Sequence, residues 1–185
     1  QGFIGSNKKS FTTTLGREGS DYSAAIFAHA LNAEMVTIWK DVRGVLNADP
    51  RYFNKTKLLK KISYEEAIEL AFYGASVIHP KTLQPLKKKN IPLYVKSFLR
   101  PSREGTLISK QDSSVRNIPS YIVKWNRVLL KISSKDFSFI VEKKISLIFS
   151  MLSKYKMKVE LIQNSAISFS VVLNNKYGGL DELLD

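Results

Sequence analysis

Short apolar runs alternate along the first half of the chain with segments whose apolar residues recur every three or four positions. The first pattern is typical of buried strands, and the second of helices that pack along one side. A Thr-rich segment with a polar middle comes before them and predicts a hairpin. We expect a hairpin within residues 2–15, helices at 21–31, 62–74 and 79–90, and strands at 35–39 and 91–96. This alternation predicts an α/β fold with a largely parallel sheet.

Capping signals mark the ends of the second and third helices. Ser63 and Glu66 have the spacing of a capping box, and Gly74 is a residue that commonly ends a helix. Pro80 suits the first position of the next helix, directly after His79. A capping or packing role, rather than a catalytic one, is expected for both His29 and His79.

The chain changes character near residue 100. Residues 100–106 and 111–114 are loop-like and polar, and we place a domain boundary at 112–119. Beyond it the pattern predicts strands at 127–132, 158–162 and 167–173, and helices at 139–155 and from 179. This β-α-β-β-α order is one strand short of a ferredoxin-like unit. The expected domains are therefore residues 1–114 and 115–185.

The charge balance is strongly basic, with 29 Lys and Arg against 16 Asp and Glu. Nucleic-acid binding would call for clustered cations beside aromatic stacking platforms. Here the excess is dispersed, with 18 basic and 10 acidic residues in 1–115 and 11 and 6 in 116–185. We therefore expect a solvated basic surface and no nucleic-acid partner, although the positive field would favour a polyanion such as ATP.

The composition also narrows the class of protein. The absence of cysteine excludes disulfides and thiolate chemistry. No apolar run approaches the roughly 18 residues of a membrane span, and residues 1–4 do not resemble a signal peptide. A cytoplasmic protein without membrane contact is expected.

A glycine-bearing loop at residues 16–21 leads directly into the first expected helix. Unpaired N–H groups and the positive end of the helix dipole suit a carboxylate or phosphate, and Arg17 adds a two-pronged donor. The same residues also fit an ordinary capped helix after a turn, with Ser20 or Asp21 as the N-cap. The spacing matches neither a Walker A loop nor a dinucleotide fingerprint.

Charged residues follow the first buried strand. Lys40 and Asp41 come directly after it, and Asp49 and Arg51 lie a short turn later. Open α/β sheets bind ligands at the carboxyl ends of their strands, so Asp41 could orient a metal–nucleotide or a ribose and Arg51 could contact phosphate or base. Asp49 and Pro50 make an equally good turn. The sequence contains no pattern typical of a Ser/His/Asp triad or a clustered metal site.

Several of these segments, in order, resemble the aspartate kinase branch of the amino-acid kinase family. The matching segments are QGFIGS (1–6), TTTLGREGSDYSAA (12–25), IWKDVRGV (38–45), ADPR (48–51), ISYEEA (62–67), YGASVIHPKT (73–82) and GTLI (105–108). The resemblance covers residues 1–110. It implies the C-terminal half of a three-layer α/β/α sandwich, followed by a truncated ferredoxin-like domain of the ACT regulatory type.

The resemblance implies transfer of the γ-phosphoryl group of ATP to the β-carboxylate of L-aspartate, with Mg²⁺ required. It assigns the substrate to Arg17, Gly19 and Ser20, and gives Asp21 the catalytic role of orienting lysine or metal groups around the phosphates. No residue is assigned as a metal ligand. It assigns the nucleotide to Lys40, Asp41, Leu46, Arg51, Ser76 and Val77.

The chain departs from the family at four of these positions. The family often has Gly, Thr, Tyr and Lys where Glu18, Lys40, Leu46 and Ser76 stand. Loss of a lysine at position 76 removes a phosphate contact, which we hypothesise that Lys40 replaces. The family's Lys-Phe-Gly-Gly phosphate-binding segment does not occur in the sequence, so we expect the 185-residue chain by itself to lack kinase activity.

The second expected domain resembles modules that bind an amino-acid end product between paired domains. By this resemblance the effector would contact Ser138, Glu160, Gln163, Asn164 and Ser165. Lysine is the first expected effector and threonine the second, and a homodimer would form through this region. A plain hairpin turn at residues 163–165 is the alternative.

Three other functions are compatible with parts of the pattern. The chain could be a stand-alone amino-acid sensor without kinase activity, or a basic nucleic-acid-binding protein. It could also be another amino-acid kinase that uses glutamate, carbamate or a nucleoside monophosphate as acceptor. The 16–21 loop and the ACT-like region favour aspartate.

Overall fold

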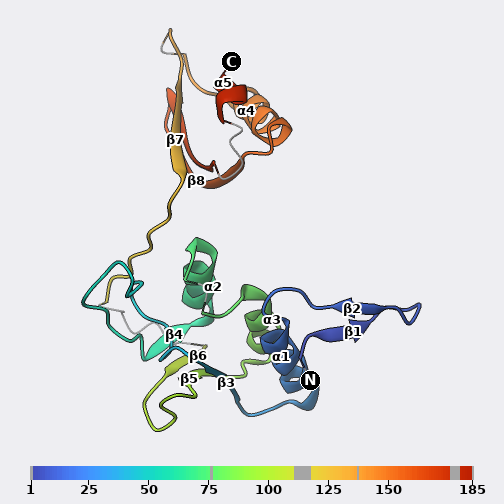
Figure 1. Cartoon of the computed structure of the whole chain (residues 1–185). Coiled ribbons are helices and arrows are strands. Elements are labelled where there is room, and N and C mark those ends of the chain that lie inside the picture. The colour runs from blue at the N-terminus through green and yellow to red at the C-terminus, as the bar shows by residue number, and fades with distance from the viewer. Residues whose placement is uncertain (1, 76, 111–117, 137, 176–179, 185) are drawn as a thin grey trace. The chain divides into compact units, whose positions relative to one another are not determined.

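The computed structural model describes residues 2–75, 77–110, 118–136, 138–175 and 180–184 (Figure 1). The chain forms two compact units, Gln1–Val123 and Lys124–Asp185. Residues 118–123, on the far side of the expected boundary, belong to the first unit because they bond to it: the Tyr121 N–H donates to the Asn47 carbonyl. The functional division at residue 114 stays a prediction.

The first unit combines a hairpin with a mixed four-stranded sheet in the order β3-β5-β6-β4. Strands β3 and β5 pair in parallel, as do β4 and β6, whereas β5 and β6 are antiparallel. Figure 1 shows the three helices of this unit together on one face of that sheet. The elements are β1 (Ile4–Ser6), β2 (Thr12–Thr14), α1 (Gly19–Leu31), β3 (Val36–Lys40), β4 (Lys61–Ser63), α2 (Tyr64–Tyr73), α3 (Pro80–Lys89), β5 (Leu93–Ser97) and β6 (Thr106–Ser109).

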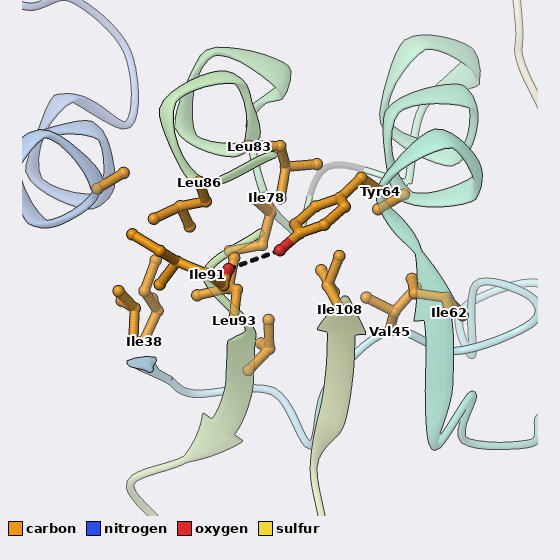
Figure 2. Packing of buried hydrophobic residues seen from close by; sticks show 14 of the residues in the cluster. Ile38, Val45, Ile62, Tyr64, Ile78, Leu83, Leu86, Ile91, Leu93 and Ile108 are labelled. Atoms are coloured by element: carbon orange, nitrogen blue, oxygen red, sulfur yellow. Dashed lines mark hydrogen bonds between the residues drawn. The ribbon is translucent and has the colours of Figure 1, made fainter. Parts of the chain in front are cut away.

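Alternate residues of the strands point toward the helices and form the core. In β5, Leu93 and Val95 are fully buried, and Ile108 of β6 lies beside them. Figure 2 shows Leu93 and Ile108 packed beneath α2 and α3, together with Tyr64. The Tyr64 hydroxyl donates to the Ile91 carbonyl at 2.6 Å, so the one polar atom of this large side chain is satisfied within the core.

The predicted ends of α2 and α3 are confirmed. The Ser63 hydroxyl accepts from the Glu66 N–H, the Glu66 carboxylate accepts from the Ser63 N–H, and Gly74 ends the helix with φ 128°. The His79 side chain caps α3 by accepting from the Lys81 N–H, with Pro80 at the first position.

The predicted cap of α1 is wrong. The helix begins at Gly19, and its N-cap is Glu18, which has a left-handed backbone with φ 56°. Gly19 N–H donates to the Gly16 carbonyl and closes a turn there, which places Ser20 and Asp21 inside the first helical turn.

The second unit is an antiparallel sheet in the order β7-β9-β8 with a helix over one face. Its core joins Phe169, Val171 and Leu173 of the central strand to Leu152 of the long helix. The predicted β-α-β-β-α order is confirmed. The elements are β7 (Arg127–Ser133), α4 (Glu142–Lys154), β8 (Lys158–Asn164), β9 (Ser168–Asn174) and α5 (Leu180–Leu184).

Candidate functional site

A cavity of about 540 Å³ lies in the first unit, where the chain leaves the carboxyl end of β3. Its wall comes from three segments that are far apart in the sequence: the loop after β3, the end of α2 with the residues that follow it, and residues 121–122. Ligands of open α/β sheets bind at this end of the strands. The cavity is therefore the candidate nucleotide site.

The loop that forms most of the wall is held by buried polar contacts. Gly44, at φ 137°, turns the chain so that the Val45 N–H donates to the Thr106 hydroxyl at 2.8 Å. The buried Asn47 side chain accepts from the Lys57 N–H at 2.7 Å, and the Asn47 N–H donates to the Lys57 carbonyl at 2.9 Å. Because a buried amide is costly to leave unbonded, these contacts fix the loop in one conformation.

Arg51 stands at the mouth of this cavity, and Asp49 orients it. The guanidinium donates to both carboxylate oxygens of Asp49, from Nε at 3.1 and 3.0 Å and from Nη2 at 2.6 Å. Hydrogen bonds from Arg51 hold the pKa of the Asp49 carboxyl below its ordinary value. The same hydrogen bonds to Asp49 raise the pKa of Arg51. The Arg51 side chain remains 79% exposed, so its other donors face solvent and could meet a phosphate.

An ion pair joins α1 to the end of β3, the strand that comes directly before the loop of the cavity wall. Asp21, in the first turn of α1, lies 2.8 Å from the Nζ of Lys40, the last residue of β3. Both side chains are largely shielded from solvent, with 13% and 20% of their surfaces exposed. The pair therefore fixes the ammonium group of Lys40, one residue before Asp41, which lines the cavity.

The predicted substrate residues lie around the start of α1. Gly19 is buried, and a Cβ there would stand 2.6 Å from the Cβ of Phe3, so no larger residue fits without a shift. Arg17 and Ser20 are exposed. The side chains of both are therefore accessible to a ligand at this end of the helix.

Four of the six predicted nucleotide residues come together in the wall of the cavity, namely Asp41, Leu46, Arg51 and Val77. Lys40 is adjacent through the chain, and Ser76 lies outside the described residues. Their role in binding a nucleotide stays a prediction. The sequence reasoning missed Tyr121 and Ile122, which line the same cavity and carry no local motif.

Among the described residues, carboxylates that could bind a divalent cation occur one at a time and not as a cluster of metal ligands. Within them, no three His, Cys, Asp or Glu side chains gather in a way that could hold a metal ion. Mg²⁺ in phosphoryl-transfer sites is held chiefly by the substrate phosphates with one or two carboxylates. The exposed carboxylate of Asp41 on the cavity wall fits that requirement.

The predicted effector residues divide into two groups in the second unit. Ser138 lies near the β8–β9 turn, because the Ile140 N–H donates to the Ala166 carbonyl at 3.0 Å. Gln163 and Asn164 end β8 at that same turn, Ser165 follows them, and all three are exposed.

Glu160 lies apart from this group, at an irregularity of β8 near the start of the strand. Burial by itself would raise the pKa of the Glu160 carboxyl, but hydrogen bonds from Arg127 and Lys124 hold it below its ordinary value. The Arg127 Nε lies 2.7 Å and the Lys124 Nζ 3.0 Å from its Oε2. Its carboxylate is therefore already engaged.

No helix among the described parts of the chain has the length and apolar character to cross a membrane.

The sequence model of the amino acid kinase family matches residues 1–97, which include α1, the loop after β3 and most of the cavity wall. The chain belongs to the amino acid kinase family. It is 38% identical over 178 residues to lysine-sensitive aspartokinase 3 of Escherichia coli, a match that covers 94% of this chain and 38% of the relative. It is 36% identical over 175 residues to the aspartokinase of Rickettsia felis, covering 95% and 44%.

Solved structures of aspartate kinases also match this chain. E. coli aspartokinase III in complex with lysine and aspartate matches 100% of this chain and 41% of that one, at 38% identity and a TM-score of 0.75. The aspartate kinase of Clostridium acetobutylicum matches 99% and 43%, at 30% identity and a TM-score of 0.86. The chain thus spans about two fifths of these relatives, and the resemblance to aspartate kinases is confirmed.

Proposed function

We propose that the protein is an aspartate kinase, which transfers the γ-phosphoryl group of ATP to the β-carboxylate of L-aspartate. This reaction opens the biosynthesis of lysine, threonine and methionine. The observation that carries the proposal is the Asp21–Lys40 ion pair, which joins the predicted substrate helix to the end of β3, directly before the loop that lines the cavity. E. coli aspartokinase III, whose complex with aspartate and ADP has been solved, is 36% identical to this chain in that structure.

The proposed chemistry depends mainly on positioning and on neutralising negative charge. The N-terminus of α1, with Arg17 beside it, would hold the aspartate carboxylates. Lys40 would approach the transferred phosphoryl group while Asp21 fixes its direction. Mg²⁺, when bound with ATP, would neutralise phosphate charge near Asp41. Arg51, oriented by Asp49, would contact the nucleotide at the cavity mouth.

The test is a coupled ADP-release assay on the protein at its full native length, with L-aspartate, ATP and Mg²⁺. Asp21→Asn should lower kcat at least about tenfold, because Lys40 then loses its orienting charge. Lys40→Ala should raise the KM for ATP. Lys88→Ala, which removes an exposed lysine on α3, serves as the matched control and should change neither constant.

An unchanged KM for ATP in Lys40→Ala would remove the phosphate role of that residue. Turnover with glutamate, carbamate or a nucleoside monophosphate in place of aspartate would change the acceptor. Absence of turnover with every acceptor would favour a stand-alone amino-acid sensor.

We further propose that the second unit binds an amino-acid effector where the loop of Ser138 lies beside Asn164 and Ser165 of the β8–β9 turn. Lysine is the first ligand to test and threonine the second. The adjacency of the two loops supports this site. We also propose homodimerisation through this unit. Isothermal titration with each amino acid tests the site, since no heat from either would refute it, and sedimentation velocity tests the dimer.

A further inference from the structure

Tyr121 is the one aromatic side chain among the described residues that line the cavity. The rest of the apolar wall is aliphatic, as at Leu46, Ala48 and Ile122. An aromatic ring can bind a flat ligand group by stacking, which aliphatic side chains do not provide. The ring of Tyr121 is therefore the feature of this wall that suits a planar group.

The backbone of Tyr121 is held against the loop that follows β3. Its N–H donates to the Asn47 carbonyl at 2.7 Å, and Tyr121 forms a parallel β-bridge with Ala48. The Asn47 Nδ2 donates to the Pro119 carbonyl at 3.1 Å, two residues before Tyr121. Because Asn47 and Ala48 are themselves buried, these contacts give Tyr121 a fixed place in the wall.

The side chain of Tyr121 is supported by a second ring and still reaches solvent. Its ring centroid lies 5.8 Å from that of Phe53, with an angle of 30° between the two ring planes. Tyr121 nevertheless remains 51% exposed, which leaves ring surface for a ligand in the cavity. A ring that is already held in place loses little conformational freedom when a ligand stacks on it, so less of the binding free energy is spent on ordering it.

The charged and apolar parts of the wall match the two parts of a nucleotide. Under the proposed function, on which this inference rests, Asp41 and Arg51 meet the metal and the phosphates. The base of a nucleotide is flat and uncharged, and Tyr121 offers a matching surface in the same cavity. The cavity volume of about 540 Å³ lies within the range of small-molecule and cofactor sites.

We propose that the base of the bound nucleotide stacks on Tyr121, with Phe53 as the positioning residue that supports the ring. Every base has a π-face, so this contact strengthens binding without choosing among bases by itself. It acts on the base and not on the phosphates. Its loss should therefore weaken the binding of ATP and ADP and leave the binding of a polyphosphate without a base unchanged.

Three substitutions at Tyr121 separate the ring from the other properties of the side chain. Tyr121→Phe keeps the ring and removes the hydroxyl, Tyr121→Leu keeps an apolar side chain and removes the ring, and Tyr121→Ala removes both. Phe53→Leu tests the supporting ring. The matched control is Phe11→Leu, which removes an exposed ring between β1 and β2, outside the cavity wall.

The measurement is isothermal titration of each full-length variant with ADP and Mg²⁺, after thermal melts confirm folding. Tyr121→Leu and Tyr121→Ala should each raise the Kd for ADP about tenfold, and Phe53→Leu about threefold. Tyr121→Phe and Phe11→Leu should stay within about twofold of the unaltered protein. In the ADP-release assay the KM for ATP should rise by similar factors, whereas the inhibition constant of inorganic tripolyphosphate should not change.

The outcomes separate this inference from the proposed function. If the unaltered protein does not bind ADP, the proposed function fails and the stacking contact with it. If it binds ADP, and Tyr121→Leu binds ADP as tightly as Tyr121→Phe, the nucleotide site stands and stacking on Tyr121 is refuted. An inhibition constant for tripolyphosphate that rises in step with the Kd for ADP would also refute it, because Tyr121 would then only support the wall.

Discussion

Gly44 allows a sharp test of how the cavity wall is held. A Cβ added at this residue would lie 2.6 Å from the Thr106 hydroxyl oxygen and 3.0 Å from a Leu58 methyl carbon, at a backbone φ of 137°. Gly44→Ala therefore adds backbone strain of about 1–3 kcal/mol. It also displaces the buried hydroxyl that accepts from the Val45 N–H, at about 1–2 kcal/mol. We expect a loss of about 2–5 kcal/mol in the free energy of unfolding.

Gly16→Ala is the matched control, because Gly16 also has positive φ, at 83°, but no atom lies within 4 Å of its added Cβ. It should cost only about 1 kcal/mol. Urea unfolding is followed by Trp39 fluorescence in a Trp125→Phe background, so that the signal reports the first unit alone. Equal losses for the two alanine variants would show that the Thr106 contact does not hold the loop.

Two further predictions concern buried polar groups. Tyr64→Phe leaves the Ile91 carbonyl without its donor and should lower the unfolding free energy by about 1–2 kcal/mol in the same urea assay. Because burial raises the pKa of Tyr64, the stabilisation from its hydroxyl should also be lost as pH rises above about 10. An unfolding free energy that does not change over that pH range would contradict this. Glu160 has a pKa below its ordinary 4.5, so the stabilisation from its carboxylate is present above pH 4.5 and is lost as the pH falls through its lowered pKa. The difference in unfolding free energy between the unaltered protein and Glu160→Gln should therefore shrink in acid. A difference that stays constant with pH would refute the ion-pair assignment.

The helices were predictable because their signals are local. Ser63 and Glu66 lie three residues apart, and both hydrogen bonds of the capping box form in the structure. Strands β4 and β6 were missed as strands, since three or four residues carry too little periodicity to distinguish a strand from a loop. Their strand character comes from pairing with each other across more than forty residues of sequence.

The start of α1 shows a different limit. Ser20 and Asp21 are good capping residues, but the N-cap lies two residues before Ser20, at Glu18, which takes the left-handed conformation that usually favours Gly or Asn. The family often has Gly at this position, so the departure at Glu18 falls on a residue with an unfavourable backbone. Propensity alone cannot reveal this, because the turn is closed by a backbone hydrogen bond to Gly16.

The cavity combines what the sequence can and cannot predict. Its charged groups, such as Asp41 and Arg51, follow a buried strand in an order that already indicates a ligand site. The part of its wall that Tyr121 and Ile122 form depends on Asn47, which in the sequence looks like an ordinary turn residue. In the fold, its buried side chain donates to Pro119, 72 residues further along, because that is where an otherwise unsatisfied amide finds an acceptor. The same bond helps to place Tyr121 at the cavity, so the wall of this site is completed by a residue that lies far along the chain from the loop it contacts.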